Sequence, residues 1–282
     1  MTRFFKISSM IILITIIAFV LCTIKEWYFF STHGRTLLKE KDPITVIFAA
    51  DDNYILPLSV ALTSLNMNTK APVEIFVLTE GLSEKNIKTL QHIDDKFTKL
   101  TIHILPVDSS VFDQFPINDR WSKSSYFRYL IPELLPLHKR AIYLDADILI
   151  FKDLSDFFET NLNNTPIGGI SDAFEDNFLQ RPLFKDHKFY INSGVLLLDL
   201  EKLRKLNITK QLFKATDLNK DKFTHFDQDA INYVLKDNIK IFPTKYNAQQ
   251  PKNCNGNDNK LQIRITCLRS GFFRLHSFIF LS

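Results

Sequence analysis

The sequence predicts an α/β protein built on a central, mostly parallel sheet that is flanked by helices. Two observations support this expectation. Continuous apolar runs rich in β-branched residues, the pattern of strands buried on both faces, alternate with segments of helical spacing. The chain has 282 residues, 45% of them hydrophobic, which is enough for one large domain or two small ones with a proper core.

Four strands, the first two of them buried, and three helices are expected to alternate in the first half of the chain. The strands are ITVIFAA, VEIFVLTE, LTIHILPV and RAIYLDADILI, over residues 44–50, 73–80, 100–107 and 140–150. The helices are expected over 54–68, 83–97 and 124–136. Helical spacing marks the first of them at Leu56, Val60, Leu62 and Leu65, and prolines interrupt the third at Pro132 and Pro136.

The second half of the chain is more mixed. Strands are expected over 165–174, over 189–200 and over 239–249. The first of these ends at Asp172, and the second has a polar break at Asn192, Ser193 and Gly194. Helices are expected over 209–218 and over 225–237. In the latter Asp227 would lie near the N-cap, with an inner face of Ala230, Val234 and Leu235.

Composition disfavours several classes of function. The net charge is only +4, from 35 basic and 31 acidic residues, and no dense basic stripe suggests nucleic-acid binding. The seven glycines spell neither G-x-G-x-x-G nor G-x-x-x-x-G-K-[ST], so no glycine loop of the usual kinds would cradle a phosphate. Cys22, Cys254 and Cys267 allow at most one disulfide, Cys254 to Cys267, and form no zinc framework.

The N-terminal region carries the clearest targeting signal. Residues 7–24, ISSMIILITIIAFVLCTI, are uncharged and predict an uncleaved membrane anchor between a short tail, 1–6, and a polar stem, 25–42. A cleaved signal peptide and a buried core helix are the alternatives. Basic residues flank both ends of the apolar run, so the positive-inside rule does not decide its orientation.

Asp145 and Asp147 lie where the fourth strand runs out, inside an otherwise apolar run. Ligands of parallel sheets bind outside the carboxyl ends of the strands, and a charge in an apolar setting needs compensation. Where the chain turns, both carboxylates can converge on one ion, and hard oxygen ligands suit Mg²⁺ or Mn²⁺. The alternatives are a helix cap beside a solvated aspartate, and a phosphatase site of the haloacid-dehalogenase type.

Four motifs in this order resemble those of glycosyltransferase family 8, the retaining nucleotide-sugar transferases that include bacterial lipopolysaccharide glucosyl- and galactosyltransferases and, more distantly, glycogenin. The motifs are FAADDNYILPLSVALTSL, SSYFRYLIPELLP with KRAIYLDADILIFKDL, FYINSGVLLLDL and FDQDAINYVL, between Ile44 and Asn247. The resemblance implies a GT-A-type nucleotide-sugar-binding fold, with the catalytic domain over 43–253. It also implies a UDP-sugar donor, Mn²⁺ (or Mg²⁺), and a glycan, glycolipid or glycoprotein acceptor.

The resemblance implies roles for individual residues. Those that would hold the nucleotide and donor sugar are Asp51, Asn53, Tyr54, Arg128, Asp145, Ala146, Asp172, Asn192, Ser193 and Asp227. Gln228, Asp227 and Arg128 would act at the reacting centre, and Asp145 and Asp147 would bind the metal. An amide is a poor nucleophile, so Gln228 favours attack on the same face as departure. Ordinary caps and turns are the alternative for each motif.

The resemblance breaks near the C-terminus. The family usually closes with a segment like H-x-x-G-x-x-K-P-W, whose His is the third metal ligand and whose Gly and Lys hold the diphosphate. The tryptophans of this chain are Trp27 and Trp121, so 254–282 is an atypical segment in which His276 is the one candidate substitute for that ligand. The alternative function is therefore a catalytically impaired transferase-fold protein that binds UDP-sugar or acts as a scaffold.

The expected arrangement of tail, anchor, stem and domain resembles that of a single-pass, type II membrane protein. In a eukaryote such a chain would be Golgi-like, with membrane contact through 7–24. In a bacterium it would face the cytoplasm from the inner membrane.

Overall fold

A computed structural model of the chain describes residues 42–118, 122–174, 177–249 and 266–267. The expected tail, the expected anchor and almost all of the expected stem lie outside these residues, as does most of the atypical segment 254–282 with His276 and Cys254. Nearly all the described residues belong to one compact unit, Pro43–Ser282.

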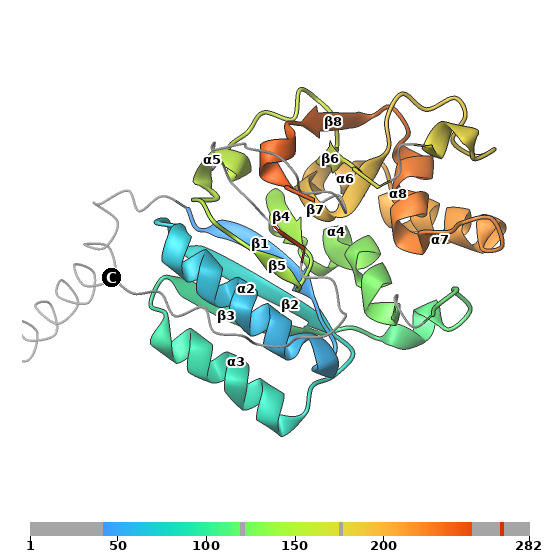
Figure 1. Cartoon of the computed structure of the whole chain (residues 1–282). Helices are drawn as coiled ribbons and strands as arrows, with labels where there is room; N and C mark the ends of the chain where they lie inside the picture. The colour runs from blue at the N-terminus through green and yellow to red at the C-terminus, as the bar shows by residue number, and fades with distance from the viewer. Residues whose placement is uncertain (1–41, 119–121, 175–176, 250–265, 268–282) are drawn as a thin grey trace, which may run out of the picture. The chain divides into compact units, whose positions relative to one another are not determined.

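A seven-stranded sheet forms the centre of this unit, in the order β3-β2-β1-β4-β7-β6-β8 (Figure 1). Its strands are β1 (Ile44–Ala49), β2 (Val73–Thr79), β3 (Leu100–Pro106), β4 (Arg140–Leu144), β6 (Ile167–Ser171), β7 (Ile191–Asp199) and β8 (Ile239–Phe242). Only β7 runs against its neighbours, pairing antiparallel with both β4 and β6; the other pairs are parallel. The predicted mostly parallel α/β sheet is confirmed.

Helices cover both faces of the sheet (Figure 1). They are α2 (Ile55–Asn68), α3 (Glu84–Lys96), α4 (Ile131–Leu134), α5 (Ser155–Phe158), α6 (Leu200–Lys205), α7 (Ile208–Asn219) and α8 (Phe226–Leu235). One buried cluster joins α2 and α3 to one face, and a second joins α6, α7 and α8 to the other. Short 3-10 helices complete the described fold: η2 (Asp52–Tyr54), η3 (Ser109–Phe112), η4 (Lys123–Leu130), η5 (Phe178–Gln180) and η6 (Thr244–Tyr246).

The strand expected over 140–150 is two strands. β4 ends at Leu144, the chain turns at 145–147, and β5 (Ile148–Leu149) leaves the sheet to pair antiparallel with β9 (Thr266–Cys267). Helix α2 supports the residue after β5, because Ser64 Oγ accepts the N–H of Ile150 (3.0 Å) and Asn68 Nδ2 donates to its carbonyl (2.9 Å). The turn between the two strands carries both aspartates of the D-x-D motif.

Three local expectations are corrected and one is confirmed. In α2, Leu62 and Leu65 are buried as expected, but Leu56 and Val60 are exposed, and Ile55, Leu58 and Ala61 complete the buried face. The helix expected over 124–136 is the 3-10 helix η4 followed by α4, because Pro132 fits only the first turn of a new helix. The expected position of Asp227 is confirmed, since the N-cap of α8 is His225 and Asp227 lies in the first turn. Helix α6 directly follows β7, in residues that the sequence assigned to that strand or to no element.

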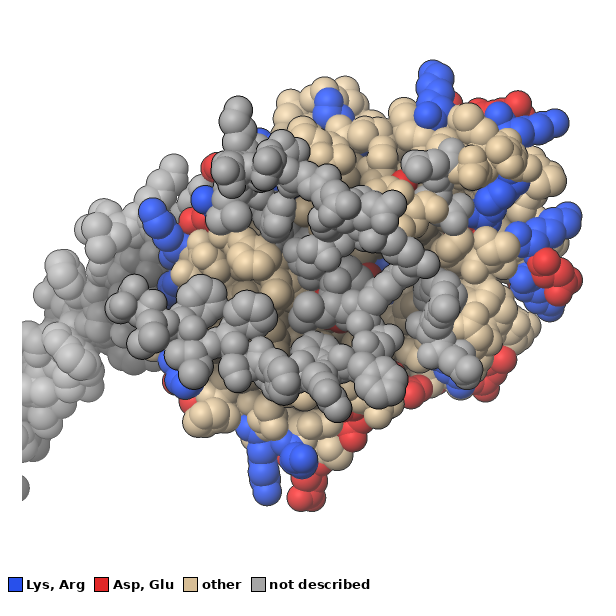
Figure 2. Space-filling model, in the orientation of Figure 1, with Lys and Arg blue, Asp and Glu red and all other residues tan. Residues whose placement is uncertain are grey.

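Charges on the outer surface are mixed. On the face drawn in Figure 2, Lys and Arg side chains stand beside Asp and Glu side chains around the edge of the described unit. Among the described residues, no helix combines the length and the apolar character needed to cross a membrane. The expected single-pass, type II location is therefore not supported, and the segment on which that expectation rested, 7–24, lies outside the described residues.

The central strand β7 provides a stability test. Leu197 is fully buried there, so Leu197→Ala should lower the free energy of unfolding by about 2–5 kcal/mol, because it removes buried apolar surface and leaves a cavity. Leu218→Ala in α7 is the matched control, since Leu218 is 65% exposed and its truncation should change stability by less than about 0.5 kcal/mol. Urea denaturation followed by circular dichroism measures both, and equal losses would contradict the placement of β7 in the core.

Candidate active site

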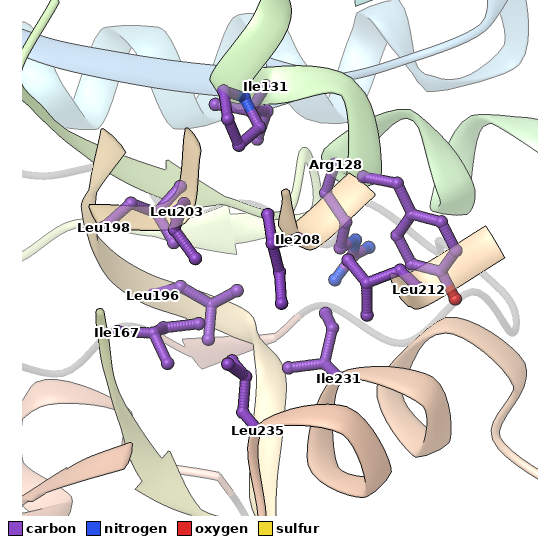
Figure 3. Close-up of a pocket in the computed structure, with 12 residues that line it drawn as sticks. Arg128, Ile131, Ile167, Leu196, Leu198, Leu203, Ile208, Leu212, Ile231 and Leu235 are labelled. Carbon is purple, nitrogen blue, oxygen red and sulfur yellow. The ribbon is translucent and has the colours of Figure 1, made fainter. Parts of the chain in front are cut away.

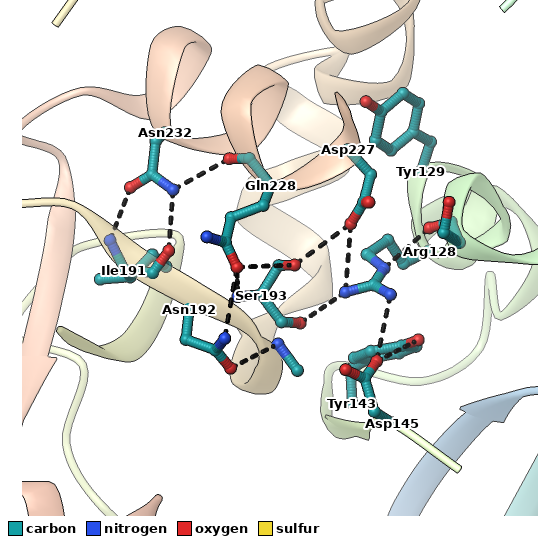
Figure 4. Close-up of polar contacts among 12 residues, drawn as sticks. Arg128, Tyr129, Tyr143, Asp145, Ile191, Asn192, Ser193, Asp227, Gln228 and Asn232 are labelled. Atoms are coloured by element: carbon teal, nitrogen blue, oxygen red, sulfur yellow. Dashed lines mark hydrogen bonds and ion pairs between the residues drawn. The ribbon is translucent and has the colours of Figure 1, made fainter. Parts of the chain in front are cut away.

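Polar side chains converge where β4 ends and β7 begins. Because β7 is antiparallel to β4, its first residues lie beside the carboxyl end of β4, and Asp145 N donates to Gly194 O at 2.9 Å. The N-terminal turn of α8 and the 3-10 helix η4 bring further side chains to the same place (Figure 4). The site is thus built from four separate chain segments at one end of the parallel strands, where α/β proteins bind ligands.

The guanidinium of Arg128 is at the centre of this site. Its Nε donates to Ser125 O (2.8 Å), its Nη1 to Ser193 O (2.7 Å) and its Nη2 to Asp145 Oδ1 (3.1 Å). Nη1 also lies 3.2 Å from Asp227 Oδ2, and the Arg128 side chain is only 7% exposed. Burial by itself would lower the pKa of Arg128, but Asp227 and Asp145 raise it by more than burial lowers it. The pKa is therefore raised, and the guanidinium stays charged.

Two donors, one from η4 and one from β4, bind the same oxygen of Asp145. Besides Arg128, the hydroxyl of Tyr143 donates to Asp145 Oδ1 at 3.0 Å. The ring of Tyr143 also packs under the guanidinium, 4.4 Å from Arg128 Cζ. Burial raises the pKa of Tyr143, which keeps the phenol protonated and able to donate. Ala146 is buried, whereas Asp145 and Asp147 are half-buried.

Asp227 is the most deeply buried acid of the Arg128 cluster. Its side chain pairs with Arg128 and accepts a hydrogen bond from Ser193 Oγ at 3.1 Å. Burial raises its pKa to about 6; Arg128 opposes the rise and Asp145 adds to it. The pKa of Asp227 is therefore closer to neutral pH than the pKa of an exposed aspartate.

The amide of Gln228 is fixed by its neighbours on both sides. Its Oε1 accepts from Ser193 N (3.0 Å) and Asn192 Nδ2 (3.3 Å), and its Nε2 donates to Asp172 Oδ2 (2.9 Å). Asn192 also donates to Asp172 and accepts from Asn247 Nδ2 (3.0 Å). These contacts bring the predicted residues Asp172, Asn192, Ser193 and Gln228 into one network.

Two further side chains lock α8 against the sheet. Asn232 uses both ends of its amide on the main chain of Ile191, accepting at 2.8 Å and donating at 2.9 Å. The buried carboxylate of Asp229 accepts from Tyr190 OH and Arg181, and from the backbone N–H of Thr224 (2.6 Å). Together they fix the turn that carries Asp227 and Gln228.

The predicted nucleotide residues form a separate turn after β1. Asp51 Oδ1 accepts the N–H of Asn53 at 2.9 Å and so caps the 3-10 helix that ends at Tyr54. The neighbouring Asp52 binds the start of α3, accepting from Ser83 N (2.9 Å) and from Asn86 Nδ2. This turn follows β1, the parallel neighbour of β4, and is thus on the same edge of the sheet as Asp145.

The donor set suits a hard divalent cation only in part. Asp145 and Asp147 provide two carboxylates in one turn, the ligand type that Mn²⁺ and Mg²⁺ prefer. Within the described ranges, no group of three His, Cys, Asp or Glu side chains is arranged to hold a metal ion. His276, the one histidine considered as a third ligand, lies outside those ranges.

A small cavity lies in the core behind Arg128 (Figure 3). Its volume is about 30 Å³, and its other walls are mainly aliphatic side chains such as Leu196, Ile208 and Ile231. A cavity of this size is far too small for a sugar, and its apolar walls offer few partners for water, so it is a gap in the packing rather than a ligand site. Of the predicted site residues, Arg128 alone lines it.

Several residues of the site were missed from the sequence. Tyr143, Asn232 and Asn247 were assigned to a strand, a helix and a strand, and gave no signal of their own. Asn232 hydrogen-bonds Ile191 and Asn247 hydrogen-bonds Asn192, and both pairs are far apart in the sequence. An amide inside the mostly apolar face of a helix, as at Asn232, is the one signal that could have pointed to a buried polar contact.

Comparison with known proteins gives a consistent set of relatives. The family model described as Glycosyl transferase family 8 matches residues 45–266. General stress protein A of Bacillus subtilis is 29% identical over 218 residues, covering 75% of this chain and 76% of that protein. Lipopolysaccharide 1,2-glucosyltransferase of Escherichia coli is 24% identical over 232 residues, covering 80% and 67%. The structure of galactosyltransferase LgtC in complex with donor and acceptor sugar analogs superposes with a TM-score of 0.65 at 27% identity, covering 73% of this chain and 76% of that one.

The raised pKa of Asp227 predicts a specific pH dependence of stability. The folded state holds this proton up to a pH of about 6, whereas the unfolded chain releases it near 3.8. The stabilisation is therefore full below the unfolded pKa and is lost as pH rises through about 6, a change of about 2–3 kcal/mol. Asp227→Asn, which cannot titrate, should remove this component from the pH profile of the free energy of unfolding.

Urea denaturation at pH 4.5, 5.5, 6.5 and 7.5 measures the difference between the two proteins. Asp156→Asn, at an exposed acid of α5, serves as the control and should follow the wild-type profile. Parallel profiles for Asp227→Asn and wild type would show that Asp227 is ionised throughout this range.

Proposed function

Because the chain belongs to glycosyl transferase family 8, we propose that it is a retaining, metal-dependent hexosyltransferase. It would move glucose or galactose from a UDP-sugar to a glycan, glycolipid or glycoprotein acceptor. One observation carries this proposal: side chains from four separate segments meet in one hydrogen-bonded network at the carboxyl end of β4. They are Arg128 of η4, Asp145 of the turn after β4, Ser193 of β7, and Asp227 and Gln228 of α8. The names of the relatives, a glucosyltransferase and a galactosyltransferase, support the choice of hexose.

The donor would lie across the edge of the sheet, within the catalytic domain proposed for residues 43–253. Asp51, Asn53 and Tyr54 would hold the uridine, since their turn follows β1 beside β4. The ribose and diphosphate would lie next to Asp145 and Ala146. The sugar would then reach the network of Asp172, Asn192 and Gln228, whose amide and carboxylate groups match the hydroxyls of a hexose.

Asp145 and Asp147 are the residues that would hold Mn²⁺ or Mg²⁺. Such an ion, when bound, neutralises the charge that develops on a departing diphosphate. Arg128 contributes a fixed positive charge in the same place, because burial and two carboxylates hold its guanidinium rigidly. Asp227, in turn, keeps that guanidinium oriented from the opposite side.

The contacts of Gln228 favour same-face attack over a covalent intermediate. Its Oε1 is turned toward the donors of Asn192 and Ser193, so it is already occupied by the protein. In the proposed step the acceptor hydroxyl oxygen bonds to the anomeric carbon as the bond from that carbon to the phosphate oxygen breaks. The hydroxyl proton passes to the departing phosphate oxygen, and Gln228 would stabilise the positive charge that develops on the sugar or orient the acceptor.

A second candidate function is a catalytically impaired transferase-fold protein that binds UDP-sugar or acts as a scaffold. The observation that favours it is the ligand set, since the described residues add no third metal ligand to Asp145 and Asp147. Binding and turnover separate the two functions, because a scaffold would still bind UDP.

The metal ligands give the direct test of the proposed activity. Asp145→Asn and Asp147→Asn should each lower the Mn²⁺-dependent rate of UDP release from UDP-glucose or UDP-galactose by about 10²–10³-fold, because each removes a charged ligand. The purified full-length chain is assayed with and without Mn²⁺, and UDP binding is measured by calorimetry. Asp156→Asn is the control for a nearby exposed acid and should keep the wild-type rate.

Each result assigns the function. Turnover that requires Mn²⁺ and either aspartate supports the transferase. UDP binding without turnover, even in excess Mn²⁺, would leave the scaffold as the function. Turnover that is independent of both aspartates would contradict the proposed metal site.

A further inference from the structure

The Cα atom of Gly194 faces the carboxylate of Asp145 across the pair of strands β4 and β7. A Cβ added to Gly194 would lie 2.4 Å from Asp145 Oδ2 and 3.1 Å from Asp145 Cγ. It would also lie 3.1 Å from Asn192 Oδ1, which accepts the N–H of Gly194 at 3.0 Å. No other residue type fits this position while Asp145 stays where it is.

The carboxylate of Asp145 cannot move away from such a Cβ without losing other contacts. Its other oxygen, Oδ1, is fixed by Arg128 Nη2 at 3.1 Å and by Tyr143 OH at 3.0 Å, and both donors are buried. An aspartate has only two side-chain torsions, so moving Oδ2 also moves Oδ1. Any shift large enough to admit the Cβ therefore disturbs at least one of these contacts.

Backbone strain does not explain the glycine at 194. Among the glycines of the described residues, Gly81 alone has a φ in the left-handed region, at 146°. Alanine could therefore adopt the backbone conformation of Gly194, and the obstacle to it is the contact with Asp145. The position needs space, not conformational freedom.

We propose that Gly194 is a positioning residue for Asp145: its missing side chain reserves the space in which the Asp145 carboxylate is held against Arg128 and Tyr143. Gly194 would thereby set how Asp145 is presented to a metal-bound diphosphate. This last step rests on the function proposed above, whereas the contact between Gly194 and Asp145 does not.

A double-mutant cycle tests the contact without reference to activity. Gly194→Ala should lower the urea midpoint of unfolding in the wild-type background. In the Asp145→Ala background the same substitution should lower the midpoint much less, because the 2.4 Å contact with Asp145 Oδ2 is gone and only the 3.1 Å contact with Asn192 Oδ1 remains. If Gly194→Ala alone fails to fold, a folded Gly194→Ala/Asp145→Ala protein supports the proposal. Equal losses in both backgrounds would overturn it.

The consequence for the site is tested by UDP binding with a matched control. Calorimetry with and without Mn²⁺ should show at least a tenfold loss of Mn²⁺-dependent UDP affinity in Gly194→Ala. Gly169→Ala, on the neighbouring strand β6, should stay within twofold of wild type. Its Cβ would also make a tight contact, 2.6 Å, but with the apolar Cδ1 atom of Ile191 and not with Asp145.

The unfolding and UDP-binding measurements together distinguish the positioning role of Gly194 from the proposed transferase function. Unchanged affinity in a folded Gly194→Ala protein would overturn the positioning role. If the wild-type chain itself bound no UDP with Mn²⁺, the proposed function would fail, and the unfolding cycle alone would then decide the contact between Gly194 and Asp145.

Discussion

The buried positive charge of Arg128 is the interaction on which the rest of the site depends. A guanidinium with a 7% exposed side chain has lost nearly all its water, and two carboxylates and two carbonyls replace it. Those partners come from η4, from the turn after β4, from β7 and from α8. Each segment is therefore held in place by a charge that cannot be left unpaired without a large loss of free energy. Stability and function are coupled here, since the same contacts fold the protein and orient its site.

The direction of β7 makes this convergence geometrically feasible. A parallel neighbour of β4 would place its last residues beside Asp145, but an antiparallel one places its first residues there. The polar triplet 192–194 therefore meets the aspartate turn even though the two segments are nearly fifty residues apart. The register also sets Gly194 opposite Asp145, which leaves no room for a side chain between them.

The sequence predicted the sheet and the members of the site better than it predicted how they are held. Continuous apolar runs identified β1, β2 and β4, because strands buried on both faces have no polar face to obscure them. The same pattern found β3, although β3 is an edge strand and is largely half-buried. Asp145 and Asp147 were predicted at a strand end and lie there. Leu56 and Val60 misled, since helical spacing does not say which of two apolar stripes faces the core. Asp227 was read as an N-cap neighbour, and its burial follows only from packing against Arg128, a contact across about a hundred residues that no local pattern encodes.

The amide of Asn232 has a consequence for how this protein would respond to mutation. It pairs with the backbone of Ile191 as an adjacent strand would, offering one acceptor and one donor, and its donor also reaches Gln228 O (2.9 Å). Aspartate has the shape but not the donor, and leucine has the volume but neither group. A saturation scan for activity would therefore rank this position with the residues that meet substrate, although the hydrogen bonds of its side chain all go to main-chain atoms. Intolerance there would reflect the attachment of helix α8 to strand β7. A list of substrate-binding residues drawn from such a scan alone would wrongly include Asn232.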